Sequence, residues 1–98
     1  MQYESGENII LGDIVETNIL NKVDKFKVVM IGETGEFISL NAETAKWAIE
    51  SGHVGKENIM IEYFKENPLA HNNSNYAPVS NTISTDVSGI VFSHRSKP

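Results

Sequence analysis

The stretch Ile9-Ile10-Leu11-Gly12-Asp13-Ile14-Val15-Glu16 places two short apolar runs on either side of a Gly-Asp pair. Short apolar segments that are interrupted by turn residues are typical of β-strands. The stretch lies close behind the polar opening Glu4-Ser5-Gly6-Glu7-Asn8, so we expect folding to involve the first residues of the chain. This pattern predicts a small β-domain rather than an enzyme built around a deep cleft.

The length and composition fit a single domain over residues 1–98. A domain near this size buries roughly 60–65% of its unfolded surface, enough for one core. Hydrophobic residues make up 40% and charged residues 21% of the chain, which is typical of a folded globular protein. The absence of cysteine excludes disulfides, thiolate metal sites and a cysteine nucleophile, and it fits a reducing compartment.

No segment of the sequence has the pattern of a membrane span or a leader. No apolar run approaches the roughly 18–20 residues that cross a bilayer. The opening Met1-Gln2-Tyr3-Glu4-Ser5 lacks the positive charge and the apolar stretch of a signal peptide. We therefore expect a cytoplasmic protein that is not bound to a membrane.

The charge of the chain argues against binding to nucleic acid. The net charge is −5 and the pI is near 5.0, whereas phosphate-backbone binders carry clustered Lys and Arg. Residues 1–66 contain twelve of the thirteen acids and six of the eight bases. An acidic surface speeds the encounter with a basic partner. The alternative is that mild acidity only keeps the protein in solution.

Strand patterns alternate with turn residues in the first two thirds of the chain. After a polar connection at Asn18–Lys25, the runs Phe26–Ile31 and Phe37–Leu40 flank a glycine-containing link, which predicts a hairpin. Asn58–Lys65 predicts another strand, central or covered by the helix, because both of its faces carry apolar residues. Its faces hold Ile59, Ile61 and Tyr63 on one side, and Met60, Glu62 and Phe64 on the other.

The period changes to that of a helix between Asn41 and Gly52. Asn41 is a predicted N-cap, since its side chain can accept from a free N–H of the first turn. Gly52 is a predicted stop. Between them an apolar stripe recurs at helical spacing, formed by Ala42, Ala45, Ala48 and Ile49.

Trp47 lies nearly opposite that stripe on a helical wheel, with Glu43 and Glu50 as its neighbours. One interpretation is an aromatic anchor in an acidic setting, because Trp is enriched at the centres of protein interfaces. The alternative is a structural role, in which a loop covers Trp47 or the domain packs the helix on two sides.

Residues 66–86 form a segment that is rich in Asn and Ser, with scattered apolar residues. Such a long loop in a small domain is generally functional or disordered. The strand pattern returns at Val87–His94. Together the patterns predict a mainly β (α+β) fold, with a bent antiparallel sheet or an SH3-like half-barrel and one amphipathic helix.

The sequence contains no recognisable catalytic or metal-binding motif. His53, His71 and His94 share no metal-ligand spacing. The chain has no P-loop and no nucleophile elbow, and its clustered glutamates lack the desolvated cleft that acid–base catalysis needs. We expect no enzymatic activity, no metal and no cofactor.

The opening pattern Met1-x-Tyr3-x-Ser5-Gly6-Glu7-x-Ile9-x-Leu11-Gly12-Asp13-x-Val15 resembles that of small β-rich bacterial immunity proteins. Those proteins are encoded beside polymorphic toxins of the contact-dependent inhibition and type VI secretion kind. Further similarity lies in Thr34–Phe37, in the segment from Glu43 to Trp47, and in Thr85–Phe92. The resemblance implies a protein that binds and blocks one cognate toxin.

An acidic inhibitor would suit a basic nuclease toxin, because carboxylates can occupy phosphate-binding positions. The residues that we expect to contact the toxin are Glu33, Glu36, Glu43, Trp47, Glu50 and, in the long loop, Tyr76. An alternative from another class is a phage or mobile-element adaptor that binds a host protein or a small ligand. A third hypothesis is a small hydrolase. Exposed strand edges permit dimerisation without predicting it.

Overall fold

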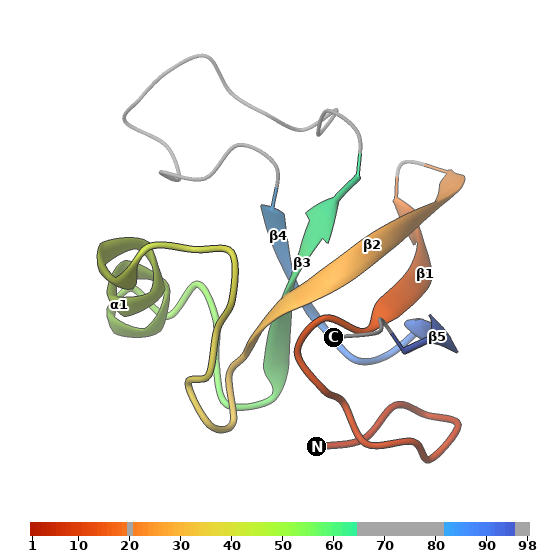
Figure 1. Cartoon of the computed structure of the whole chain (residues 1–98), viewed down its shortest axis with the longest axis horizontal. Coiled ribbons are helices and arrows are strands. Elements are labelled where there is room, and N and C mark those ends of the chain that lie inside the picture. Colours follow the sequence, from red (N-terminus) through yellow and green to blue (C-terminus); the bar gives the residue numbers. More distant parts are fainter. Residues whose placement is uncertain (20, 65–81, 96–98) are drawn as a thin grey trace.

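The computed structural model describes residues 1–19, 21–64 and 82–95. Within them, five strands form one antiparallel sheet in the order β4-β3-β2-β1-β5, and one helix lies beside it (Figure 1). The elements are β1 (Ile14–Ile19), β2 (Lys22–Ile31), α1 (Ala42–Glu50), β3 (Asn58–Tyr63), β4 (Thr82–Asp86) and β5 (Val91–His94). The two edge strands do not pair with each other in this part of the chain. The predicted mainly β fold with one helix is therefore confirmed, as an open sheet and not a closed barrel.

The hairpin at the start of the sheet joins β1 to β2, with pairing from Ile14↔Lys27 to Ile19↔Lys22. The prediction of a polar connection at residues 18–25 was wrong, since most of this segment belongs to the two strands. Asn21 adopts a positive φ of 63°, which Asn tolerates better than most residues, and this permits a tight turn. Polar side chains remain compatible with strand pairing here because this end of the hairpin faces solvent.

The second predicted hairpin is only partly formed. Residues 37–40 make no strand, although Phe37 forms a single bridge with Met30 and the Ile38 N–H donates to Val29 O at 2.9 Å. Ser39 then takes a positive φ of 59° and turns the chain toward α1. Residues 37–40 therefore pair with β2 through a single bridge, because the chain must leave the sheet to begin α1 at Ala42.

β3 lies between β2 and β4, as a central strand. Its side chains alternate between two clusters: Ile59, Ile61 and Tyr63 face one side, and Met60 packs beneath α1. The predicted alternation is confirmed, and β3 is both central and covered by the helix.

The chain reverses direction between β4 and β5. The predicted last strand at Val87–His94 was wrong in its first half, because Ile90 N–H donates to Val87 O in a turn and Gly89 has a φ of +78°. β5 pairs antiparallel with β1. Thr82–Asp86, at the end of the predicted polar loop, forms β4 instead. The rest of that loop, including Tyr76, lies outside the described residues.

The two sides of the sheet bury different cores. One side packs large side chains against the N-terminal segment; the buried members of this cluster are Tyr3, Ile9, Val15, Phe26, Val28, Ile31, Ile59, Ile61, Tyr63 and Ile90. On the other side, the cluster under α1 consists of Val29, Met30, Ala45, Ala48, Val54 and Met60. Figure 1 shows α1 and the N-terminal segment on opposite sides of β2.

Helix α1 is capped as predicted. The Thr44 N–H donates to Asn41 Oδ1 at 2.7 Å, and Gly52 has a φ of +76° just beyond the C-cap. The predicted apolar stripe was wrong in its position, because Ala42 is exposed and Ile49 is 43% exposed.

The buried face of α1 is instead formed by Thr44, Ala45 and Ala48, and the half-buried Trp47 packs against the same core. Trp47 is therefore not opposite the buried face. The helix is rotated toward Trp47 because its ring offers more apolar area to bury than the side chain of Ile49 does, and Ala45 and Ala48 allow close packing on the sheet.

Candidate functional site

Two of the predicted contact residues line one open hollow of about 350 Å³ beside the N-terminal turns of α1. The hollow is formed by Glu43 and Trp47 together with Asn41 and Thr44. Helical side chains lean toward the N-terminus, so Trp47 is directed over the turn that carries Glu43. The helical spacing that suggested this pair therefore predicted a real juxtaposition.

The Trp47 indole is held in place on its inner side. It packs against the core beneath α1, and the His53 ring lies beside it, with 5.0 Å between ring centroids and an interplanar angle of 39°. The remaining indole surface faces the hollow. Trp47 thus packs against the core, as the structural alternative predicted, while part of its side chain lines the hollow.

The four predicted glutamates differ in their electrostatic surroundings. The N-terminal ammonium group of Met1 lies 3.2 Å from Glu33 Oε1, and Lys46 Nζ lies 3.8 Å from Glu50 Oε1. Both of these carboxylates are partly neutralised. Glu43 and Glu36 have no hydrogen-bond or ion-pair partner for their carboxylates among the described residues.

The hollow does not bring all of the predicted site residues together. Glu33 and Glu36 lie in the turn after β2, and Glu50 lies at the far end of α1. None of these three lines the hollow. Tyr76 lies outside the described residues. The structure therefore singles out Glu43 and Trp47 from the predicted set.

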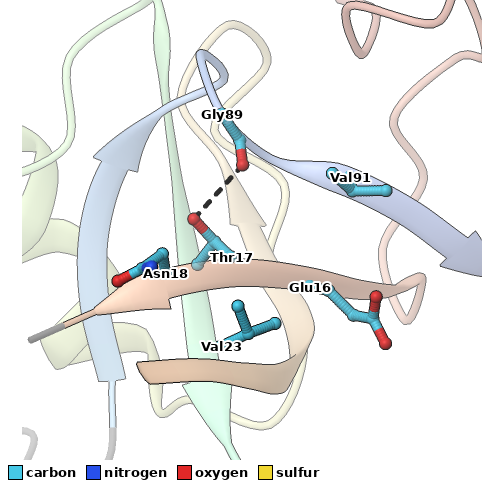
Figure 2. A pocket seen from close by; sticks show the side chains of 6 residues that line it. All are labelled: Glu16, Thr17, Asn18, Val23, Gly89 and Val91. Carbon is cyan, nitrogen blue, oxygen red and sulfur yellow. Dashed lines mark hydrogen bonds between the residues drawn. The ribbon is translucent and has the colours of Figure 1, made fainter. Parts of the chain in front are cut away.

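A second hollow, of about 240 Å³, lies where β1 extends beyond its pairing with β5 (Figure 2). The Thr17 hydroxyl donates to Gly89 O at 3.3 Å across it, and its exposed apolar side chains are Val23 (63% exposed) and Val91 (58% exposed). This hollow could not be predicted from the sequence, because it depends on the pairing of two strands from opposite ends of the chain.

A polar network that was not predicted surrounds Asp13, which is fully buried. Asp13 Oδ2 accepts from the Tyr3 hydroxyl at 2.7 Å and from the Ile10 N–H at 3.0 Å. Arg95 Nε donates to Asp13 Oδ1 at 3.0 Å. Phe92 stacks near Tyr3, with 5.3 Å between ring centroids, and the Arg95 guanidinium lies 5.3 Å from the Phe92 ring centroid.

Solvent does not reach the Asp13 carboxylate, so the protein itself supplies all of its hydrogen-bond partners. Burial raises the pKa of Tyr3, and the hydrogen bond to Asp13 raises it further. The hydrogen bond that Arg95 donates to the Asp13 carboxylate raises the pKa of Arg95. The network joins the N-terminal segment, the start of β1 and the end of β5. Its only sequence signal was the Gly12-Asp13 pair between apolar runs, which we interpreted as a turn.

The described residues contain no group of three or more His, Asp or Glu side chains that could hold a metal ion. His53 is engaged with Trp47, His94 lies at the end of β5, and His71 is outside the described residues.

The described part of the chain includes no helix with the length and apolar character needed to cross a membrane.

The structure therefore offers one surface on which predicted contact residues meet, the hollow of Glu43 and Trp47. It combines one aromatic side chain with one carboxylate that has no hydrogen-bond or ion-pair partner among the described residues. Comparison of the chain with protein-family models, with curated proteins and with solved structures finds no match.

Proposed function

We propose that this chain is a non-enzymatic inhibitor that binds and blocks a bacterial toxin through the outer surface of α1. The observation that carries this proposal is that Glu43 and Trp47 line the same open hollow. The resemblance to immunity proteins supplies the toxin as partner, and the hollow supplies a surface for recognition.

Trp47 has the properties of an interface anchor. Its inner side is fixed by the core and by His53, so binding would cost little conformational entropy. Rigid aromatic side chains of this kind contribute disproportionately to binding energy when a partner covers them.

The charge near α1 favours a basic partner. Residues 32–57 carry five glutamates and two lysines, with no Asp or Arg, which leaves this part of the chain acidic. Complementary charge raises the association rate and disfavours wrong partners. A nuclease toxin with a basic phosphate-binding site fits this description.

The test uses the C-terminal domain of the protein encoded by the adjacent upstream gene. We expect tight binding by calorimetry and protection of cells that express that domain. Combining Trp47→Ala with Glu43→Lys should weaken binding by at least about tenfold, or ~1.4 kcal/mol. Unchanged affinity in a correctly folded double variant would rule out an interface centred on α1.

The second hollow provides a matched control. Replacing its exposed valines, Val23→Ser with Val91→Ser, changes a smaller hollow that lies on the sheet instead of the helix. This pair should leave the affinity unchanged. Co-purification from native cells separates the alternatives, because a host factor or a bound small molecule in place of a toxin would favour the adaptor hypothesis.

A further inference from the structure

We infer that the hollow on α1 is a subsite for a guanidinium group, so that an arginine side chain of the partner inserts between Trp47 and Glu43. This inference rests on the proposed function and specifies the chemistry of the same surface. It identifies the class of ligand: a planar cation, presented by a protein or peptide.

The aromatic side of the subsite is Trp47. Cations bind over the faces of aromatic rings, most strongly over Trp, and Arg is found there more often than Lys. The indole packs against His53 and against the core, and its remaining exposed part lines the hollow. A guanidinium group can therefore stack on the part of the ring that the protein itself does not cover.

The anionic side of the subsite is Glu43, one helical turn before Trp47. Its carboxylate has no ion-pair partner among the described residues, whereas Glu50 on the same helix is close to Lys46. The positive end of the helix dipole near Glu43 is equivalent to about half a charge, which is less than the full charge of the carboxylate. The local field in the hollow therefore still favours a cation.

The shape of the ligand follows from these two groups together. A guanidinium group can stack through its flat face and donate two parallel N–H groups to one carboxylate, whereas an ammonium group acts as a point charge. Asn41 Oδ1 already accepts from the Thr44 N–H. This leaves Glu43 as the main acceptor in the hollow and favours arginine over lysine.

The chain itself contains a reporter for this site, because Trp47 is its only tryptophan. We would titrate the full chain with acetyl-glycyl-arginyl-glycinamide and follow indole fluorescence at constant ionic strength. We expect a saturable change in the indole fluorescence, with a Kd on the order of 1–10 mM for one such contact. The lysine peptide should bind several-fold more weakly, and the neutral citrulline peptide at least about tenfold more weakly.

Matched variants on the same helix complete the test. Glu43→Gln should weaken binding of the arginine peptide at least about fivefold, whereas Glu50→Gln should change it less than about twofold, because Glu50 lies outside the hollow. Equal responses to the arginine, lysine and citrulline peptides would overturn the inference. So would an unchanged Kd in a folded Glu43→Gln variant, or equal weakening by Glu50→Gln.

Failure of this inference can be distinguished from failure of the proposed function. If the toxin domain binds and depends on Trp47, while the arginine peptide gives no saturable signal, only the guanidinium subsite is refuted. If the peptide binds as expected and the toxin domain does not, the subsite stands and the toxin is not its partner.

Discussion

Asp13 and Glu43 are two carboxylates in one small domain, and their surroundings differ in every respect. Asp13 is fully buried, and both of its oxygens accept hydrogen bonds, from Tyr3, Arg95 and the Ile10 N–H. Glu43 is exposed, has no such partner among the described residues, and lies beside a half-buried aromatic ring. A buried charge must be compensated by its own protein, so Asp13 maintains the fold. An exposed one can be compensated by a partner, so Glu43 is available for recognition.

We expect the largest loss of stability from replacement of Asp13. Asp13→Ala removes the acceptor of the buried Tyr3 hydroxyl and of the part-buried Ile10 N–H. It also removes the counter-charge of Arg95, whose side chain is 46% exposed and can be hydrated. We expect a loss of about 3 kcal/mol in the free energy of unfolding, since each buried donor left unsatisfied costs about 1–3 kcal/mol. Urea unfolding followed by circular dichroism measures it.

Asp24→Ala is the control for Asp13→Ala. Asp24 lies on β2, where its carboxylate accepts only from the adjacent Lys25 N–H among the described contacts, and we expect a change below about 1 kcal/mol. Equal losses in the two variants would break the contrast between a compensated buried carboxylate and an ordinary one.

The second effect concerns the backbone beside the α1 core. A Cβ added at Gly32 would lie 1.9 Å from Gly55 O and 2.8 Å from Asn58 O, whereas one at Gly35 meets no atom within 4 Å. We expect Gly32→Ala to cost about 2 kcal/mol through overpacking. Gly35→Ala should cost about 1 kcal/mol, because Gly35 has a positive φ. The same urea measurement compares them, and a smaller loss at Gly32 would show that the loops separate easily.

The third effect is a pH dependence. The pKa of Tyr3 is raised above its ordinary value of 10.0 in the folded protein, so the unfolded chain loses this proton first as the pH rises. The contribution of Tyr3 to the free energy of unfolding is therefore fully present below about pH 10, and it falls as the pH rises above that value. Tyr3→Phe should cost about 1.5 kcal/mol at neutral pH.

The free energy of unfolding of the Tyr3→Phe variant should also decline less steeply with rising pH than that of the wild type. The pKa of Tyr63 is raised as well, by burial, so part of the alkaline decline should remain in the variant. Parallel stability curves for the two proteins between pH 8 and about pH 11 would show that Tyr3 does not contribute in this way.

The smallest effect belongs to Glu43. Glu43→Gln should change the free energy of unfolding by only about 0.3–0.5 kcal/mol, because an exposed acid in the first turn gains only a weak helix-dipole interaction. Thermal unfolding measures it. A loss as large as that of Asp13→Ala would mean that Glu43 is a structural residue and would remove the contrast between the two carboxylates.

Local patterns predicted the elements whose signals are confined to neighbouring residues. The alternation at Ile59–Tyr63 and the caps Asn41 and Gly52 were each confirmed, because each depends on spacing within one element. The predictions that were wrong concern the polar ends of β1 and β2 and the first half of Val87–His94. The polar ends of β1 and β2 pair with each other in a tight hairpin, and Val87–Ile90 forms a turn before β5 pairs with β1, so neither outcome followed from the apolar pattern within the segment.

For the candidate site, the sequence established that Glu43 and Trp47 share one side of a helix. It could not establish which side faces the sheet, since the helix rotates to bury the largest available apolar area. That rotation gives Trp47 an inner side against the core and an outer side in the hollow. It also exposes Ile49, which the helical wheel had placed inside.

By itself, then, the sequence determined a β-rich domain with one capped helix, because alternation, capping and turn chemistry operate over a few residues. Only the tertiary structure decided that Asp13 is buried with Tyr3 and Arg95, and that Glu43 remains outside beside Trp47. The physical reason is that the environment of a charge depends on residues brought together by strand pairing across the whole chain, from position 3 to position 95.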